Sequence, residues 1–182
     1  KTPLILERSD NPLLGEGLNF TGVFVADDGA WIKSRDGLFH VNTNGLLEVY
    51  TDREGLATND VRAVIQDREG NIWIGTNGAG IQKFTGRAFS TFTAEDGISG
   101  NIVMDVLKDP YNNTWFSTYD NGLSMKSAEG RWMNYWNDGR TGTLRNTRIW
   151  CSILREDASV YFGSSGGLFT EPDNPRYWTA AE

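Results

Sequence analysis

Residues 59–76 read NDVRAVIQDREGNIWIGT, a stretch that carries the signals of two β-strands and of the turn between them. Residues 61–66 are largely apolar, as expected for a strand that is buried on both faces. Asp67 and Gly70 occupy the first and fourth positions of the next four residues, which is the pattern of a type I turn. Residues 71–76 alternate, with Ile72 and Ile74 on one face and Trp73 on the other. The stretch therefore predicts two antiparallel strands joined by a tight turn.

The same signals return with a period of about 42 residues along the whole chain. The tryptophan of the second strand recurs with spacings of 42 and 42, at Trp31, Trp73 and Trp115. A glycine before Leu or Ile recurs with spacings of 43, 42 and 45, at Gly37, Gly80, Gly122 and Gly167. Two further strand-like segments, 81–84 and 89–93, complete the clearest unit. Each repeat is therefore predicted to form four short antiparallel strands.

Such a repeat predicts an all-β fold, a β-propeller of about four blades with almost no helix. We expect one partial propeller domain over residues 1–182, with approximate blades at 18–55, 56–97, 98–140 and 141–182. The tryptophan of each second strand is predicted to fill the wedge between neighbouring blades.

The two ends of such an array pose a problem, because four blades with open ends would leave two apolar faces in water. Three arrangements avoid this: a fragment of a larger ring, a closed ring of four blades, or a ring completed by a second copy. In the closed ring, residues 4–6 would add an outer strand to the last blade. We favour a fragment or self-association.

Composition excludes several classes of function. The net charge is −7, and no basic cluster is present to track phosphates, so nucleic acid is not an expected partner. No apolar run approaches the length of a membrane span, so we expect membrane contact only through an anchor outside this sequence. Cys151 is the only cysteine, and no His/Cys cluster or calcium-loop pattern is present, so no disulfide, metal or cofactor is expected.

Residues 59–76, with the glycine turn 78–81, closely resemble the two-component regulator propeller repeat. Residues 101–109, 115–118 and 121–123 match the same repeat, with Pro-Tyr-Asn-Asn replacing part of the turn at 110–113. The resemblance implies a periplasmic sensor region of a bacterial membrane receptor, commonly one that responds to glycan fragments. It also implies a ring larger than this chain supplies.

We therefore expect a non-catalytic ligand-sensing module that recognises a carbohydrate. The alternative is a protein–protein interaction or dimerisation module without a small ligand. A glycoside hydrolase or lyase ranks third, because its paired acids would have to converge from different blades. Residues 163–167 match the G-x-S-x-G pattern of a hydrolase, but they fall on a glycine turn, and the only histidine, His40, lies far upstream.

Candidate ligand-binding residues follow from propeller geometry. Loops between the second and third strands share one face with the entries to the inner strands, and pockets need polar groups among aromatic walls. The candidates on this face are Arg35, Asn59, Arg62, Asn77, Asn101, Tyr119, Asp120, Arg148 and Ser165. Tyr119 departs from the Ser or Asn of the other repeats and offers an aromatic platform for a sugar.

A second kind of candidate lies on the predicted outer strand of the third blade. Its three large aromatic residues exceed what one blade needs to bury, so we expect an interface with another protomer. These residues are Trp132, Tyr135 and Trp136.

Overall fold

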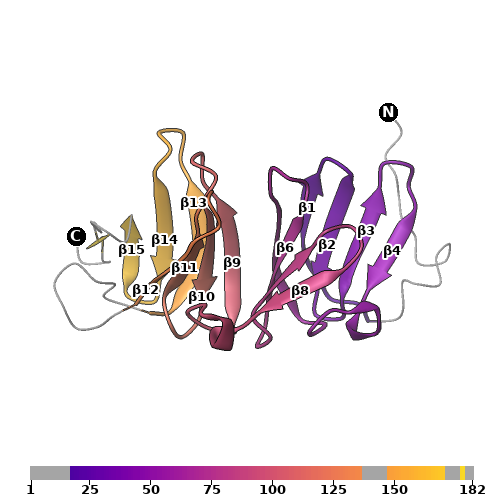
Figure 1. The fold of residues 1–182 in the computed structure, drawn as a ribbon, viewed down its shortest axis with the longest axis horizontal. Helices are drawn as coiled ribbons and strands as arrows, with labels where there is room; N and C mark the ends of the chain where they lie inside the picture. The colour runs from indigo at the N-terminus through magenta and orange to yellow at the C-terminus, as the bar shows by residue number, and fades with distance from the viewer. Residues whose placement is uncertain (1–16, 137–146, 171–176, 179–182) are drawn as a thin grey trace.

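The computed structural model describes residues 17–136, 147–170 and 177–178, and these residues form four sheets of four antiparallel strands (Figure 1). The first sheet contains β1 (Phe20–Ala26), β2 (Gly29–Ser34), β3 (Leu38–Asn42) and β4 (Leu47–Tyr50). The second contains β5 (Val61–Gln66), β6 (Ile72–Thr76), β7 (Ile81–Phe84) and β8 (Phe89–Phe92). The third contains β9 (Val103–Lys108), β10 (Thr114–Thr118), β11 (Leu123–Lys126) and β12 (Trp132–Tyr135). The fourth contains β13 (Ile149–Leu154), β14 (Val160–Ser164), β15 (Gly167–Thr170) and β16 (Tyr177–Trp178).

Each sheet is a propeller blade whose strands follow one another in chain order. Two short 3-10 turns, η2 (Asp52–Glu54) and η3 (Ala94–Asp96), precede the inner strands of the second and third blades. The predicted all-β propeller architecture is therefore confirmed. The segment 4–6, which was considered as a closing strand, lies outside the described residues.

The tight turn that was predicted from Asp67 and Gly70 is present in the structure. The backbone N–H of Gly70 donates to the carbonyl of Asp67 over 3.2 Å, and Gly70 has the positive φ of 82° that favours glycine. The Asp67 carboxylate accepts hydrogen bonds from the backbone of Asn71 at 2.8 Å and from the Trp73 indole at 2.9 Å. In the third blade Asn112, with a φ of 69°, takes the place of the glycine.

The repeated tryptophans lie in the wedges between blades. Trp31, Trp73 and Trp115 are 1%, 2% and 8% exposed. Each packs near a phenylalanine of the next blade, with ring centroids 5.4 to 5.8 Å apart in the pairs Trp31–Phe84, Trp73–Phe116 and Trp115–Phe162. Each indole also donates to an aspartate of its own blade, namely Asp28, Asp67 or Asp109. The core is thus a series of wedges that join blade to blade.

The four blades form an open arc. The inner strands contact one another in sequence, β1 with β5, β5 with β9 and β9 with β13. The first and fourth blades lie at opposite ends of the longest axis (Figure 1). The sheets are therefore not closed into a ring, as expected for a piece of a larger propeller.

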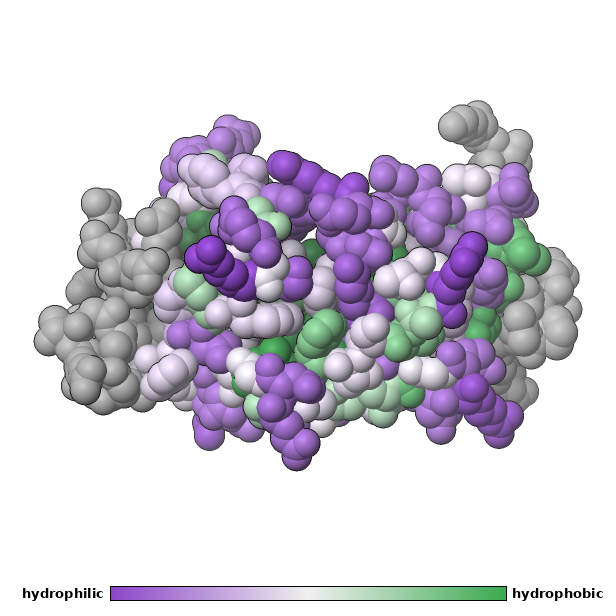
Figure 2. Space-filling view, viewed as in Figure 1, coloured by the Kyte–Doolittle hydropathy of each residue, from purple (hydrophilic) through white to green (hydrophobic). Residues whose placement is uncertain are grey.

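The arc has two edges that carry different loops. We call the lower edge of Figure 1 the connector face, because it carries η2, η3, the connectors to the inner strands and the loops between second and third strands. The opposite edge is the turn face, where the first strand of each blade turns into the second. Hydrophilic residues gather along the turn face, whereas green apolar residues are visible in the lower middle of the same view (Figure 2).

Candidate functional site

The connector face is built by a repeated backbone hydrogen bond. The first residue after each second strand donates its N–H to the residue before the inner strand of the same blade. Asn77 donates to Asp60 over 3.0 Å, Tyr119 to Ile102 over 2.9 Å and Ser165 to Arg148 over 3.2 Å. These bonds bring the second-to-third loops and the inner-strand entries together at one edge of the arc.

Neighbouring blades are also joined at this face. The N–H groups of Gly78 and Gly80 both donate to the carbonyl of Asn101 in the connector of the next blade, over 3.1 and 2.9 Å. Gly122 donates in the same way to Thr147, over 2.8 Å. The glycine loops of the second and third blades therefore hold the connectors that follow them.

A β-bulge occurs near the start of every inner strand. The register shifts leave one extra residue on each of these strands, namely Thr21, Arg62, Met104 and Trp150. A bulge redirects a side chain out of the regular alternation of the strand. The same position of each blade thus presents a different side chain beside the connector face.

Tyr119, Arg148 and Trp150 form what we call the aromatic cluster. The rings of Tyr119 and Trp150 meet edge to face, with centroids 5.0 Å apart and an interplanar angle of 77°. The guanidinium carbon of Arg148 lies 5.4 Å from the centre of the Tyr119 ring. Trp150 remains 43% exposed, although it sits on a strand. The cluster therefore offers an exposed aromatic surface next to a cation and joins the third blade to the fourth.

A polar network occupies the corresponding place in the second blade. The Asp60 carboxylate accepts hydrogen bonds from Arg62 at 2.9 Å and from the Asn77 amide at 2.8 Å. Oδ1 of Asp60 and Nε of Arg62 are buried without a hydrogen-bond partner within the protein. Buried groups of this kind are normally satisfied, so this network has unused capacity for a bound polar group.

The other predicted ligand-binding residues have different surroundings. The Asn59 and Asn101 side chains accept from the backbone of Asp52 and of Ala94, each over 2.8 Å, at the start of η2 and η3. Both amides thus stabilise the connectors. Arg35, Asp120 and Ser165 are exposed in the loops of the first, third and fourth blades.

The three aromatic residues that were predicted as an interface do not share one exposed surface. Trp132 packs against Trp73, Phe92 and Phe116 between the second and third blades. Tyr135 stacks on Trp115 with ring centroids 5.8 Å apart. Trp136 is the exposed member, at 53%. The outer strand of the third blade thus uses two of its aromatic residues inside the arc.

His40 belongs to a structural cluster of the first blade. Its ring stacks on Trp31 at 4.2 Å, and Nδ1 lies 2.9 Å from Glu48. The hydroxyl of Tyr50 donates to the same carboxylate, and burial together with the charge of Glu48 raises the pKa of Tyr50 to about 12. Ser165 lies in the fourth blade, at the other end of the arc, so the G-x-S-x-G pattern has no histidine beside it.

The described parts of the chain contain no group of three His, Cys, Asp or Glu side chains placed to hold a metal ion. Among the same residues, no helix is long and apolar enough to cross a membrane.

The family comparison bears on the second blade. Residues 55–78 match the family described as Two component regulator propeller. The second blade thus carries a segment that is similar to this family's repeat. The matched segment runs from the end of η2 through β5 and β6 and includes the Asp67 turn and the Trp73 wedge. No curated protein sequence matches the chain.

Several solved structures share this propeller fold. The extracellular domain of the hybrid two component system BT3049 from B. thetaiotaomicron superposes with a TM-score of 0.79 at 20% identity, covering 98% of this chain and 24% of that one. The extracellular domain of BT4673 from the same organism gives 0.70 at 18% identity, covering 88% and 24%. Virginiamycin B lyase from Staphylococcus aureus gives 0.69 at 18% identity, covering 88% and 55%. The repeat-containing chain thus spans about a quarter of the length of the first two structures, and at these identities the similarity shows the fold.

Sequence reasoning missed Trp150 and Asp60 as members of the connector face. Trp150 was not among the predicted site residues, because a bulge leaves no clear mark in a single sequence. A comparison of the same position in the four repeats could have identified Trp150 from the sequence. Trp150 occupies the position of Arg62 and Met104, and a tryptophan there is out of keeping with the other blades.

Proposed function

We propose that the chain is part of a periplasmic, ligand-sensing propeller of a bacterial signal-transduction receptor, and that its ligand is a carbohydrate bound on the connector face. The family match and the fold shared with extracellular domains of two hybrid two component systems support the receptor assignment. The aromatic cluster supports the ligand assignment and is the observation on which it depends.

The chemistry of the cluster suits a sugar. A tryptophan that is 43% exposed has an apolar ring free to stack on the C–H face of a pyranose. Arg148 supplies donors for hydroxyl groups, and the Asp60–Arg62–Asn77 network offers further donors and acceptors on the same face. A few convergent polar groups beside aromatic walls are typical of small-molecule sites. We assign no catalytic activity to the chain, and its function would be binding alone.

A panel of oligosaccharides tests the proposal through the melting temperature of the chain, since a ligand of the folded state raises it by mass action. We expect at least one oligosaccharide to raise the melting temperature, and Trp150→Ala to abolish that rise. Trp136→Ala is the matched control, because Trp136 is also an exposed tryptophan, at 53% against 43% for Trp150, but lies outside the aromatic cluster. If the Trp150→Ala chain keeps the full response, the site is elsewhere. If no oligosaccharide acts, the carbohydrate assignment fails.

Assembly is the second candidate function, and it is favoured by the two ends of the arc. On the first blade, Val23 and Val25 are 64% and 78% exposed. On the fourth blade, Ile153 and Leu168 are 62% and 38% exposed. Further propeller blades, or a second copy of this chain, would cover these faces. A lyase or glycoside hydrolase is the third candidate, and turnover of a substrate that is lost when paired acids on different blades are replaced would establish it.

A further inference from the structure

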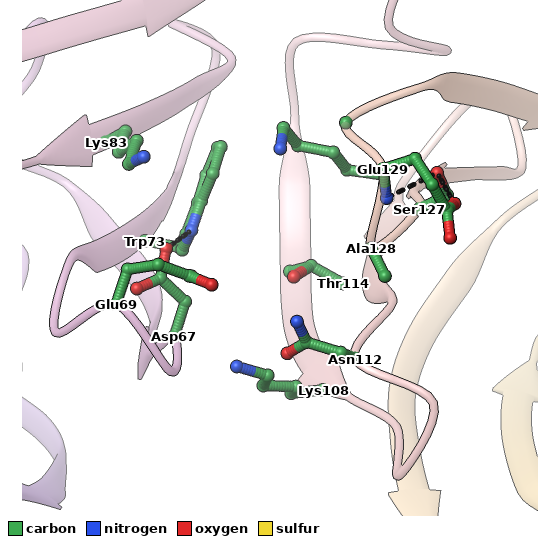
Figure 3. A pocket seen from close by; sticks show the side chains of 12 residues that line it. Asp67, Glu69, Trp73, Lys83, Lys108, Asn112, Thr114, Ser127, Ala128 and Glu129 are labelled. Carbon is green, nitrogen blue, oxygen red and sulfur yellow. Dashed lines mark hydrogen bonds between the residues drawn. The ribbon is translucent and has the colours of Figure 1, made fainter.

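A cavity of about 230 Å³ lies between the second and third blades, at the turn face and thus away from the aromatic cluster (Figure 3). The turn 67–71 of the second blade forms one wall, and the loop 127–130 of the third blade forms the other. Trp73 also lines the cavity, on the side of the second blade and beside Asp67 (Figure 3). The cavity is large enough for a small polar molecule or for one charged group of a larger ligand.

Three lysines line this space, which we call the lysine cavity: Lys83, Lys108 and Lys126. Nζ of Lys83 and Nζ of Lys126 lie 5.5 and 5.6 Å from the centre of the Trp73 ring. Lys108 projects from β9 into the gap toward the turn that carries Asp67 (Figure 3). The chain has five lysines in all, so three of them gather at one junction between blades.

The register of the sheets shows that these lysines are unusual for their position. Lys108, Thr114 and Lys126 are cross-strand neighbours and form one row across the third blade. The same row in the second blade consists of Gln66, Ile72 and Phe84, and the last two are buried against Trp31. The third blade thus places Lys126 where the second blade has the buried Phe84, and Lys108 where the second blade has the partly exposed Gln66.

The acids around the cavity leave the lysines incompletely paired. Asp67 already accepts hydrogen bonds from Asn71 and Trp73, and Glu129 accepts one from Ser127. Among the described residues, no carboxylate oxygen lies within 4.0 Å of any of the three ammonium groups. Their attraction to Asp67 and Glu69 acts across a longer gap.

Lys108 is the clearest example of an incompletely paired lysine in this cavity. Its Nζ is buried and has no hydrogen-bond partner within the protein. Burial lowers the pKa of Lys108, although the charges of Asp67 and Glu69 act in the opposite direction. An ammonium carries three donors and no acceptor, so only acceptor oxygens can satisfy it. A charged acceptor would form the strongest hydrogen bonds.

We propose that the lysine cavity binds an oxyanion, as the free ion or as a sulfate, phosphate or carboxylate group on a small molecule. Lys108 and Lys126 would hold its oxygens, and Lys83 would add positive charge from the facing blade. This site is independent of the carbohydrate proposal, because the two lie on opposite faces of the arc and share no residue.

Titration with sodium sulfate tests the proposal, with sodium chloride added to keep the ionic strength constant. The melting temperature of the chain should rise and saturate. Sulfate also stabilises proteins without binding a site, so variants must separate the two effects. Lys108→Met should melt higher than the original chain without sulfate, because a buried unpaired charge is removed, and should lose the saturable rise. Lys126→Gln should weaken the apparent sulfate affinity at least about tenfold.

Arg87→Gln is the control, because it removes an exposed positive charge near the same end of the second blade without lining the cavity. Its sulfate response should equal that of the original chain. Glucose 6-sulfate distinguishes the sources: tighter binding than inorganic sulfate indicates a sugar-borne group, and equal or weaker binding indicates the free ion. A saturable response that survives in Lys108→Met, or the absence of any saturable response in the original chain, would overturn the proposal.

Discussion

Gly75 on β6 faces Val103 on β9 of the next blade so closely that a Cβ atom built on Gly75 would stand 2.7 Å from Cγ1 of Val103. Val103 is fully buried, and Ala63 of the same blade would lie 3.3 Å from the added atom. The absence of a side chain at residue 75 therefore allows the inner strand of the third blade to pack directly on the second.

Gly75→Ala should consequently destabilise the junction between the two blades. We expect the free energy of unfolding to fall by about 1–3 kcal/mol, the usual cost of overpacking, as measured by urea denaturation. Gly22→Ala is the matched control, because its added Cβ would meet Cε of Lys33, the far end of a flexible side chain. Equal losses in the two variants would show that close packing at Gly75 is not the cause.

The Asp67 turn predicts a stability that depends on pH. Burial alone would raise the pKa of Asp67, but hydrogen bonds from Asn71 and Trp73 outweigh it and hold the pKa below its usual value. The ionised carboxylate therefore stabilises the fold above a pH of about 4, and this contribution disappears as the pH falls through the lower pKa of the folded state. Asp67→Ala should cost about 1–3 kcal/mol at pH 7 and less in strong acid.

Urea denaturation at pH 7 and at pH values below 4 measures this difference. Glu69→Ala, in the same turn but exposed, should change the unfolding free energy little at either pH. A deficit for Asp67→Ala that stays constant across this range would contradict the role of the charge.

The ionisation of Asp105 should change the stability with pH in the opposite direction to that of Asp67. It lies between the third and fourth blades, where its carboxylate accepts from the backbone and the hydroxyl of Ser152 at 2.6 and 2.7 Å. Burial raises the pKa of Asp105 in spite of these hydrogen bonds. Its ionisation therefore opposes folding, and stability falls as the pH rises from about 4, the pKa in the unfolded chain, through the higher pKa of the folded state.

Asp105→Asn keeps an acceptor for Ser152 and removes the charge. We expect the variant to be at least as stable as the original chain at pH 7 and to lose this part of the pH dependence, as followed by the melting temperature between pH 4 and 7. Ser152→Ala serves as the comparison, because it keeps the charge and removes one of its donors. It should lower stability most at neutral pH. A neutral-pH loss in Asp105→Asn would refute the interpretation.

The exposed ends of the arc predict self-association of the isolated chain. Its molar mass from light scattering should rise with concentration, because two apolar faces lack the neighbours that the inner blades have. The double variant Val25→Lys and Ile153→Lys should shift the mass toward the monomer. Leu46→Lys, at a residue that is 60% exposed in a turn, should not. A monodisperse monomer at all concentrations would rule out association through these faces.

How much of the fold and of the candidate sites could be predicted from the sequence depends on the kind of contact that forms them. Trp31, Trp73 and Trp115 recur with a fixed spacing, and the repeat therefore predicted both the blades and the wedges. The Asp67 turn is local, so its residues alone defined it. The lysine row could not be predicted, because Lys108 and Lys126 become neighbours only through the register of three strands.

The connector face shows the same limit. Asn59 and Asn101 were candidates because propeller geometry places the entries to the inner strands on one face, but the sequence does not reveal that each amide accepts from the backbone of its own connector. Trp150 was missed because a bulge is set by pairing with the second strand. Asp105 was missed because its partner, Ser152, lies 47 residues away.

The hydrogen bonds from Gly78 and Gly80 to Asn101, and from Gly122 to Thr147, join each blade only to the one that follows. The tryptophan wedges do the same. Because the same Trp–Phe wedge recurs at all three junctions, duplication or loss of one repeat in the gene would create a new junction without altering the existing ones. In such a lineage the number of blades can change in single steps, while individual junctions, such as the one with the lysines, diverge in chemistry on their own.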